Sequence, residues 1–146
     1  MKKLMILTAA MAALTTLSAA DIYVSISTGK KKNAGTKEAP LKNLWHALQK
    51  AEDGDVIHLA EGIYPGNAKC NWFLIDKAVS IIGGYSPDFA ARDPLKHRTM
   101  FQPLNENNDK KGTGLGIFTI QFDMSKLAPK GVNMVFDGLI FDDGQA

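Results

Sequence analysis

The fold is decided by residues 51–64, which read AEDGDVIHLAEGIY. From Asp55 to Ala60 the side chains alternate, with Ile57 and Leu59 on one face. The residues expected on the opposite face are Val56, His58 and Ala60. This alternation predicts a β-strand with one buried face.

An amphipathic helix is predicted immediately before this strand. Apolar residues recur at i, i+3, i+4, i+7 and i+10 on one helical face: Leu41, Leu44, Trp45, Leu48 and Ala51. Asn43 is the expected N-cap and Gly54 the expected stop. The opposite face carries His46, Gln49, Lys50 and Asp53. We therefore expect His46 to be a solvated helix residue and not a ligand.

Short strands account for most of the remaining sequence. A strand at 22–26 is followed by a polar loop from Ser27 to Pro40. Further strands are predicted at residues 72–75, 79–82, 117–122, 133–136 and 139–141, with long connections at 86–99 and 103–114. Both an antiparallel sandwich or barrel and a parallel coil produce such a pattern, and periodicity does not separate them.

The first twenty residues are typical of a secretory signal peptide. Lys2 and Lys3 precede an apolar run that ends at Leu17, and Ser18-Ala19-Ala20 supplies the small residues of a cleavage site. The run is shorter than the roughly 20 residues of a membrane-spanning helix. We expect cleavage after Ala20, export as a secreted, periplasmic or cell-surface protein, and no membrane span in residues 21–146.

Charge and cysteine content exclude several classes of protein. The chain has 17 basic and 15 acidic residues, and the leader contains two of the basic ones, so the exported chain is electrically balanced. Nucleic-acid binding would require a basic face, and none is predicted. Cys70 is the single cysteine, so no internal disulfide is possible. We expect Cys70 to act as a small buried apolar side chain.

Four segments in a fixed order resemble the N-terminal start of right-handed parallel β-helix proteins of the pectate-lyase-like superfamily. They are the strand Ile22–Ser25, the loop Asn33–Pro40, the helix Leu44–Leu48 and the segment Ala51–Tyr64 with its Gly-x-Tyr turn. Ala34 stands where proline is commoner in that loop. Residues 82–89 and 92–94 resemble the next stretch of such proteins in bacterial secreted and surface families.

The resemblance implies an all-β fold: the first coils of a right-handed parallel β-helix, closed by the amphipathic helix. A helix across the open end of a coil covers apolar interior and strand edges that would otherwise pair with another chain. Trp45 is therefore expected to belong to this cap. The last segment, Asp137 to Gly144, resembles a segment that is followed by further coils in these β-helix proteins. We therefore expect 21–146 to be the truncated start of a longer domain.

The resemblance also implies action on extracellular polysaccharide as a lyase or hydrolase, with Ca²⁺ as a possible cofactor of a longer protein. A cell-surface adhesin or glycan-binding protein without catalysis is the alternative, and a purely structural segment is a third. Such enzymes carry their chemistry on middle coils. Residues 21–146 alone are therefore expected to be inactive.

No catalytic, cofactor or metal residue is predicted within this chain. The acidic candidates at strand ends, expected to serve as turn residues, are Asp123, Asp137, Asp142 and Asp143. Asn105 to Asp109 lacks calcium-loop spacing and is expected to be a solvated loop. Gly112 to Gly116 precedes a strand, unlike a dinucleotide loop. The three histidines, His46, His58 and His97, lack metal-ligand spacing.

Overall fold

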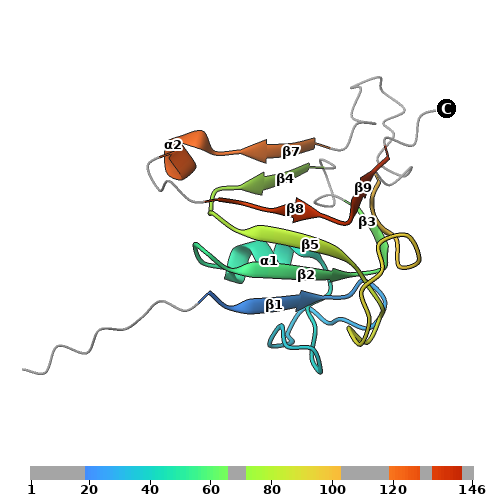
Figure 1. The fold of residues 1–146 in the computed structure, drawn as a ribbon. Helices are drawn as coiled ribbons and strands as arrows, with labels where there is room; N and C mark the ends of the chain where they lie inside the picture. The colour runs from blue at the N-terminus through green and yellow to red at the C-terminus, as the bar shows by residue number, and fades with distance from the viewer. Residues whose placement is uncertain (1–18, 66–71, 103–118, 129–132, 143–146) are drawn as a thin grey trace, which may run out of the picture.

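A computed structural model describes residues 19–65, 72–102, 119–128 and 133–142 (Figure 1). This part of the chain is mostly β, with few helices. The strands are β1 (Asp21–Val24), β2 (Val56–Ala60), β3 (Gly62–Tyr64), β4 (Trp72–Ile75), β5 (Ser80–Tyr85), β6 (Thr99–Phe101), β7 (Thr119–Phe122), β8 (Phe136–Asp137) and β9 (Leu139–Phe141). The helices are α1 (Leu44–Lys50) and α2 (Met124–Leu127).

The strands form three sheets in which all neighbours run parallel. Sheet A has the order β1-β2-β5-β8, sheet B has β3-β6-β9, and sheet C pairs β4 with β7. From β2 onward the chain enters sheets A, B and C in that order and then repeats the cycle. Each pass of the chain through the three sheets thus adds a strand next to the strand that the previous pass placed in the same sheet. Of the two arrangements that periodicity left open, the described strands adopt the parallel one.

The core lies between the sheets and is built mainly from the inward side chains of β1 to β6 and from the buried face of α1. Its fully buried members include Ile57 and Leu59 of β2, as the alternation predicts. Phe73, Tyr64 and Phe101 bring aromatic rings from β4, β3 and β6 into contact, with centroid separations of 5.9 to 6.0 Å. Such rings bury large apolar areas, so they contribute strongly to stability.

Helix α1 covers one side of this core, as predicted. Leu44, Ala47 and Leu48 are buried, and the side chain of Asn43 caps the helix by accepting from the backbone N–H of His46. Trp45 is only half-buried, although it packs against the core. The helix ends at Lys50, earlier than Gly54, because the chain becomes extended at Ala51.

A lysine from a later segment completes the end of α1. The ammonium group of Lys77 donates to the carbonyl oxygens of Leu48 at 3.1 Å and Ala51 at 2.6 Å. Carbonyl groups at a helix C-terminus lack partners within the helix, and a cation there also complements the helix dipole. Lys77 therefore ties α1 to the turn that leads into β5.

Four elements differ from the sequence prediction. The strand expected at 133–136 is formed only at Phe136–Asp137, as β8. Gly62–Tyr64, expected to be a turn, forms β3. β6 was not predicted: it begins at Thr99, where the connection expected at 86–99 ends. Both β3 and β6 have only three residues, too few for alternation to be recognised. The short helix α2 was not predicted, so the described part has two helices where one was expected.

Ala60 is more buried than expected. It was expected to lie on the outer face with His58, and it is fully buried. The pairing of β2 with β5 shifts register between His58 and Ala60, because β5 carries one extra residue there. This β-bulge breaks the alternation of side chains in β5.

Several predictions concern residues outside the described ranges: most of the leader, Cys70, the segments 105–109 and 112–116, and Asp143. Within the described ranges, neither helix has the length and apolar character needed to cross a membrane.

Candidate functional site

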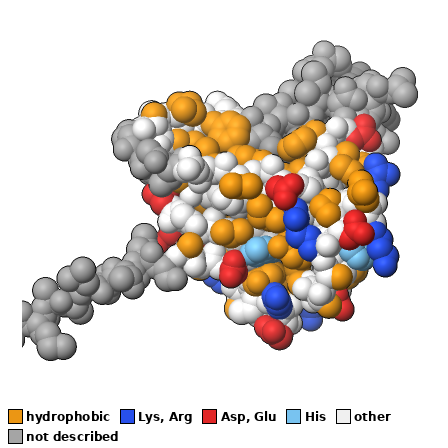
Figure 2. All heavy atoms as spheres, viewed as in Figure 1, with side chains coloured by type: hydrophobic (Ala, Val, Ile, Leu, Met, Phe, Trp, Pro, Cys, Tyr) orange, Lys and Arg blue, Asp and Glu red, His pale blue; other side chains and the backbone are white. Residues whose placement is uncertain are grey.

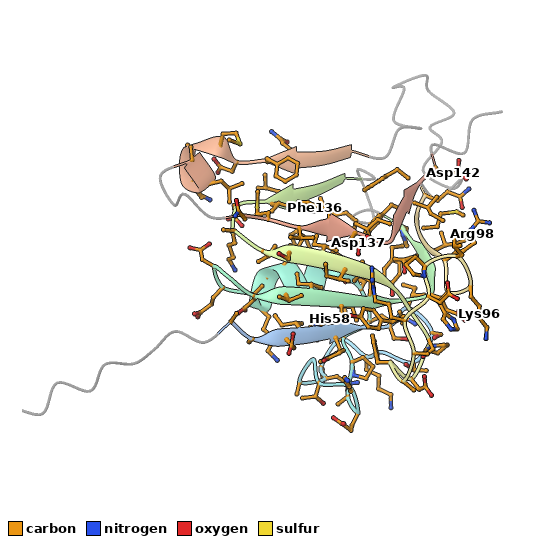
Figure 3. The ribbon with its side chains drawn as sticks, viewed as in Figure 1. His58, Lys96, Arg98, Phe136, Asp137 and Asp142 are labelled. Carbon is orange, nitrogen blue, oxygen red and sulfur yellow. The ribbon has the colours of Figure 1, made fainter. Side chains whose placement is uncertain are left out.

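The outer face of sheet A gathers polar and aromatic side chains from strands far apart in the sequence. The register aligns Tyr23 of β1 with His58 of β2, His58 with Ile82 of β5, and Ile82 with Asp137 of β8. The neighbours Ile22, Ile57 and Ile81 are buried, so this row faces outward. Figure 3 shows His58 and Asp137 on this face, with β5 between their strands.

His58 links two of these groups by hydrogen bonds. Its Nε2 lies 2.7 Å from Asp21 Oδ1, and its Nδ1 lies 3.0 Å from the Tyr85 hydroxyl. The Tyr23 ring stacks on the imidazole with a centroid separation of 4.8 Å. Only 13% of the His58 side chain is exposed, whereas 61% of the Asp21 side chain is exposed. These contacts hold the imidazole in one orientation.

The β-bulge in β5 brings Tyr85 to this face. Ile82 points outward, so strict alternation would turn Tyr85 inward three residues later. The extra residue in β5 shifts the alternation by one position, so the Tyr85 side chain faces outward. Gly84 accommodates the distortion with a φ of 88°. Bulges commonly re-aim side chains in this way beside functional sites.

Phe89 packs beneath the same cluster from the loop that follows β5. It is buried, meets the Tyr23 ring edge-on at 5.0 Å and lies 6.0 Å from the Tyr85 ring. Its φ is 58°, the single positive φ of a non-glycine residue in the described ranges. Ser86 and Asp88 hold this loop through a 2.6 Å hydrogen bond. The strained backbone is thus stabilised by contacts that place an aromatic ring under the site.

Arg92 contributes the positive charge. Its Nη2 donates to Asp137 Oδ2 at 2.6 Å, its Nε donates to the Gly83 carbonyl oxygen at 2.9 Å, and its guanidinium carbon lies 5.8 Å from the Tyr85 ring centroid. On the other flank, the ammonium of Lys37 lies 5.4 Å from the Tyr23 ring centroid. Both cations lie within the range of a cation–π contact. Figure 2 shows the resulting surface, on which charged and histidine side chains are interspersed with apolar atoms.

The two tyrosines are neutral phenols at physiological pH. Burial raises the pKa of Tyr23, and the negative charge of Asp21 raises it further. Burial also raises the pKa of Tyr85, while the Arg92 guanidinium acts in the opposite direction. The Tyr85 hydroxyl is therefore a donor in the resting protein, and a nearby cation moderates the cost of removing its proton.

An open groove of about 740 Å³ adjoins this cluster, between the loop that follows β1 and the loop that follows β5. Phe89 belongs both to its lining and to the aromatic cluster. The charged residues of the lining are Lys30, Lys37, Glu38 and Asp88. The groove thus extends the outer face of sheet A with groups of both signs.

Apart from His58 and Asp137, which lie on the outer face of sheet A, the candidates considered in the sequence lie at separate places. Asp123 precedes α2 and pairs with Lys126 at 3.4 Å, and Asp142 accepts from the Gln102 amide at 3.3 Å. His97 pairs with Glu61 at 2.5 Å. His46 contacts the Asn43 side chain, and burial together with Lys31 lowers its pKa. Within the described ranges, no group of three or more His, Cys, Asp or Glu residues could hold a metal ion.

The cluster around His58 was not predicted from the sequence. Asp21 and Tyr85 are 37 and 27 residues away from it, so no local motif joins them. One signal was available: Tyr23 and His58 are large polar side chains on the outer faces of two strands. The segments that connect successive strands of sheet A differ in length, so the sequence does not reveal the register that aligns Tyr23 with His58.

Part of this chain is similar to a described sequence family. A family model for a protein of unknown function (DUF1565) matches residues 27–91. The matched segment contains α1, β2 to β5, His58 and Tyr85, and Asp21, Arg92 and Asp137 lie outside it. No curated protein and no solved structure gives a significant match to the chain. The parallel sheets are compatible with the β-helix resemblance, and function has to be inferred from the site.

Proposed function

We propose that this chain supplies the N-terminal cap and first coils of an exported right-handed parallel β-helix protein that acts on extracellular polysaccharide as a lyase or hydrolase. The strands support the coil because they enter three parallel sheets in a repeating order. The position of α1 against the core supports the cap. The leader-like composition of residues 1–20 supports export.

The observation that carries the proposal is the outer face of sheet A with its adjoining groove. Sugar rings present apolar C–H faces that pack on aromatic rings, and hydroxyl and carboxylate groups that require donors and acceptors. Tyr23 and Tyr85 offer half-buried rings, and Arg92 and Lys37 lie beside them. An open groove next to such groups suits an extended chain better than a small enclosed ligand.

Glycan binding without catalysis is the second candidate, and the groove favours it. Lys30 and Lys37 line the groove and could neutralise acidic sugars without any proton transfer. In that case the β-helix would serve as a rigid surface that displays the binding groups.

The test uses the exported protein expressed from its complete reading frame. The substrates are polygalacturonate, alginate and chondroitin sulfate, with dextran as an uncharged control. Unsaturated-uronate absorbance reports a lyase, and new reducing ends without that absorbance report a hydrolase. Retardation in affinity electrophoresis without products indicates the binding protein. No product and no retardation with any acidic polysaccharide would contradict both candidates.

A further inference from the structure

We propose that Asp21, His58 and Tyr85 form a proton relay for β-elimination on a uronate-containing polysaccharide, with Tyr85 as the catalytic residue that meets the sugar. This inference rests on the proposed function. It places the proton-transfer groups on the first coils, where no catalytic residue was expected from the sequence.

The hydrogen bonds of His58 define one direction for the relay. An ionised carboxylate can only accept, so the imidazole must carry its proton on Nε2, which lies 2.7 Å from Asp21. In the neutral ring Nδ1 is then an acceptor, and it lies 3.0 Å from the Tyr85 hydroxyl. When His58 takes the proton of Tyr85, the resulting imidazolium faces a carboxylate that stabilises it. This is the arrangement that makes a weakly acidic hydroxyl group a usable base.

Tyr85 is the member of the relay that can reach a substrate. Both nitrogens of His58 are engaged, and its ring is covered by Tyr23 and is 13% exposed. Tyr85 is half-buried on the outer face, and its oxygen retains lone pairs beyond the contact with His58. Asp21 and His58 are therefore positioning residues that act through Tyr85.

Arg92 supplies the binding group for a uronate carboxylate. Its Nη2 already donates to the carboxylate of Asp137 at 2.6 Å. The guanidinium beside Tyr85 is therefore accessible to a carboxylate group. Two of the five N–H donors of Arg92 are used by Asp137 and the Gly83 carbonyl in the described ranges. A guanidinium on the uronate carboxylate would stabilise the negative charge that develops when the adjacent C5 proton is removed.

The reaction balances without a further reactant. Tyr85 passes its proton to His58, and the phenolate removes the C5 proton of the uronate. The C5–H electron pair forms the C4–C5 double bond as the C4–O bond breaks. Tyr85 returns the abstracted proton to the departing oxygen, and His58 then re-protonates Tyr85. The products are an unsaturated uronate end and a new hydroxyl end.

The test measures elimination and binding in parallel on the exported protein from the complete reading frame. Tyr85→Phe should lower kcat/KM at least about 100-fold with binding retained, since it removes the proton-transferring oxygen but keeps the ring. Asp21→Asn should lower kcat while KM changes little, because the imidazole loses the carboxylate that orients its Nε2 proton. His97→Gln is the matched control: His97 is also 13% exposed and paired with a carboxylate, but in a different cluster.

The outcomes separate the two proposals. Elimination that survives in Tyr85→Phe, or a kcat that falls equally in Asp21→Asn and His97→Gln, would overturn the relay and leave polysaccharide action standing. Wild-type protein that binds acidic polysaccharide or hydrolyses it without unsaturated products would also overturn the relay alone. Neither binding nor turnover would overturn the proposed function, and the relay with it.

Discussion

Truncation of Leu44 to alanine should destabilise the protein by about 3 kcal/mol. Leu44 lies on α1, is fully buried and belongs to the core cluster that includes Ile22 and Val24. The change removes three buried carbon atoms at about 0.8 kcal/mol each, and the cavity left behind adds to this cost. The slightly higher helix propensity of alanine offsets only a few tenths of a kcal/mol.

Urea unfolding followed by far-UV circular dichroism gives the difference in free energy of unfolding. The matched control is Leu95→Ala, which makes the same chemical change at a side chain that is 92% exposed. It should alter the free energy of unfolding by no more than about 0.5 kcal/mol. Comparable m values in both variants are needed for the comparison, because m reports the surface exposed on unfolding.

Equal stability of the two variants would refute the packing of α1 against the core. The same result would remove the support that α1 gives to a capped coil. A large loss in both variants would instead show that Leu95 is covered in solution, in conflict with its exposure in the structure.

Two further predictions follow from individual contacts, and a third follows from the composition of the leader. Lys77→Met should cost about 1 to 2 kcal/mol in urea unfolding, because the carbonyl groups at the end of α1 lose a charged donor, while the exposed Lys96→Met should cost little. The pKa of His46 lies below its usual 6.5 because of burial and Lys31, so the unfolded chain takes up a proton first and stability should fall as the pH drops below about 6.5. His46→Gln should therefore lose less stability than wild type between pH 7 and 5. An equal loss in both proteins would show that His46 does not cause the loss of stability at low pH. Intact mass of the exported protein should match an N-terminus at Asp21, and a retained leader would contradict the predicted cleavage.

The fold was predictable where the sequence carries a long enough pattern. Ile57 and Leu59 alternate within a five-residue strand, and the apolar pattern that marks α1 extends from Leu41 to Ala51, so both elements were found. The three-residue strands β3 and β6 were missed because alternation cannot be recognised at that length. Their identity depends on pairing with each other across the sheet, which is a tertiary interaction.

The candidate site was not predictable because it depends on register. Tyr85 faces outward only because β5 carries an extra residue opposite the segment from His58 to Ala60. A one-residue change of register reverses the face on which every later side chain lies. Neither the bulge nor the pairing of Arg92 with Asp137, 45 residues later, leaves a local signature in the sequence.

Parallel stacking explains why a relay could arise on this face at all. Neighbouring strands in a sheet lie about 4.8 Å apart, which is also the separation of the stacked Tyr23 and His58 rings. Side chains in one row of successive circuits are therefore held at contact distance whatever the length of chain between them. Asp21 and Tyr85 reach His58 from the strands on either side of β2, so β1 contributes the carboxylate and β5 the hydroxyl. A change that frees β1 from β2 should abolish the relay even if every relay residue is retained, because it removes Asp21 from its place beside the imidazole.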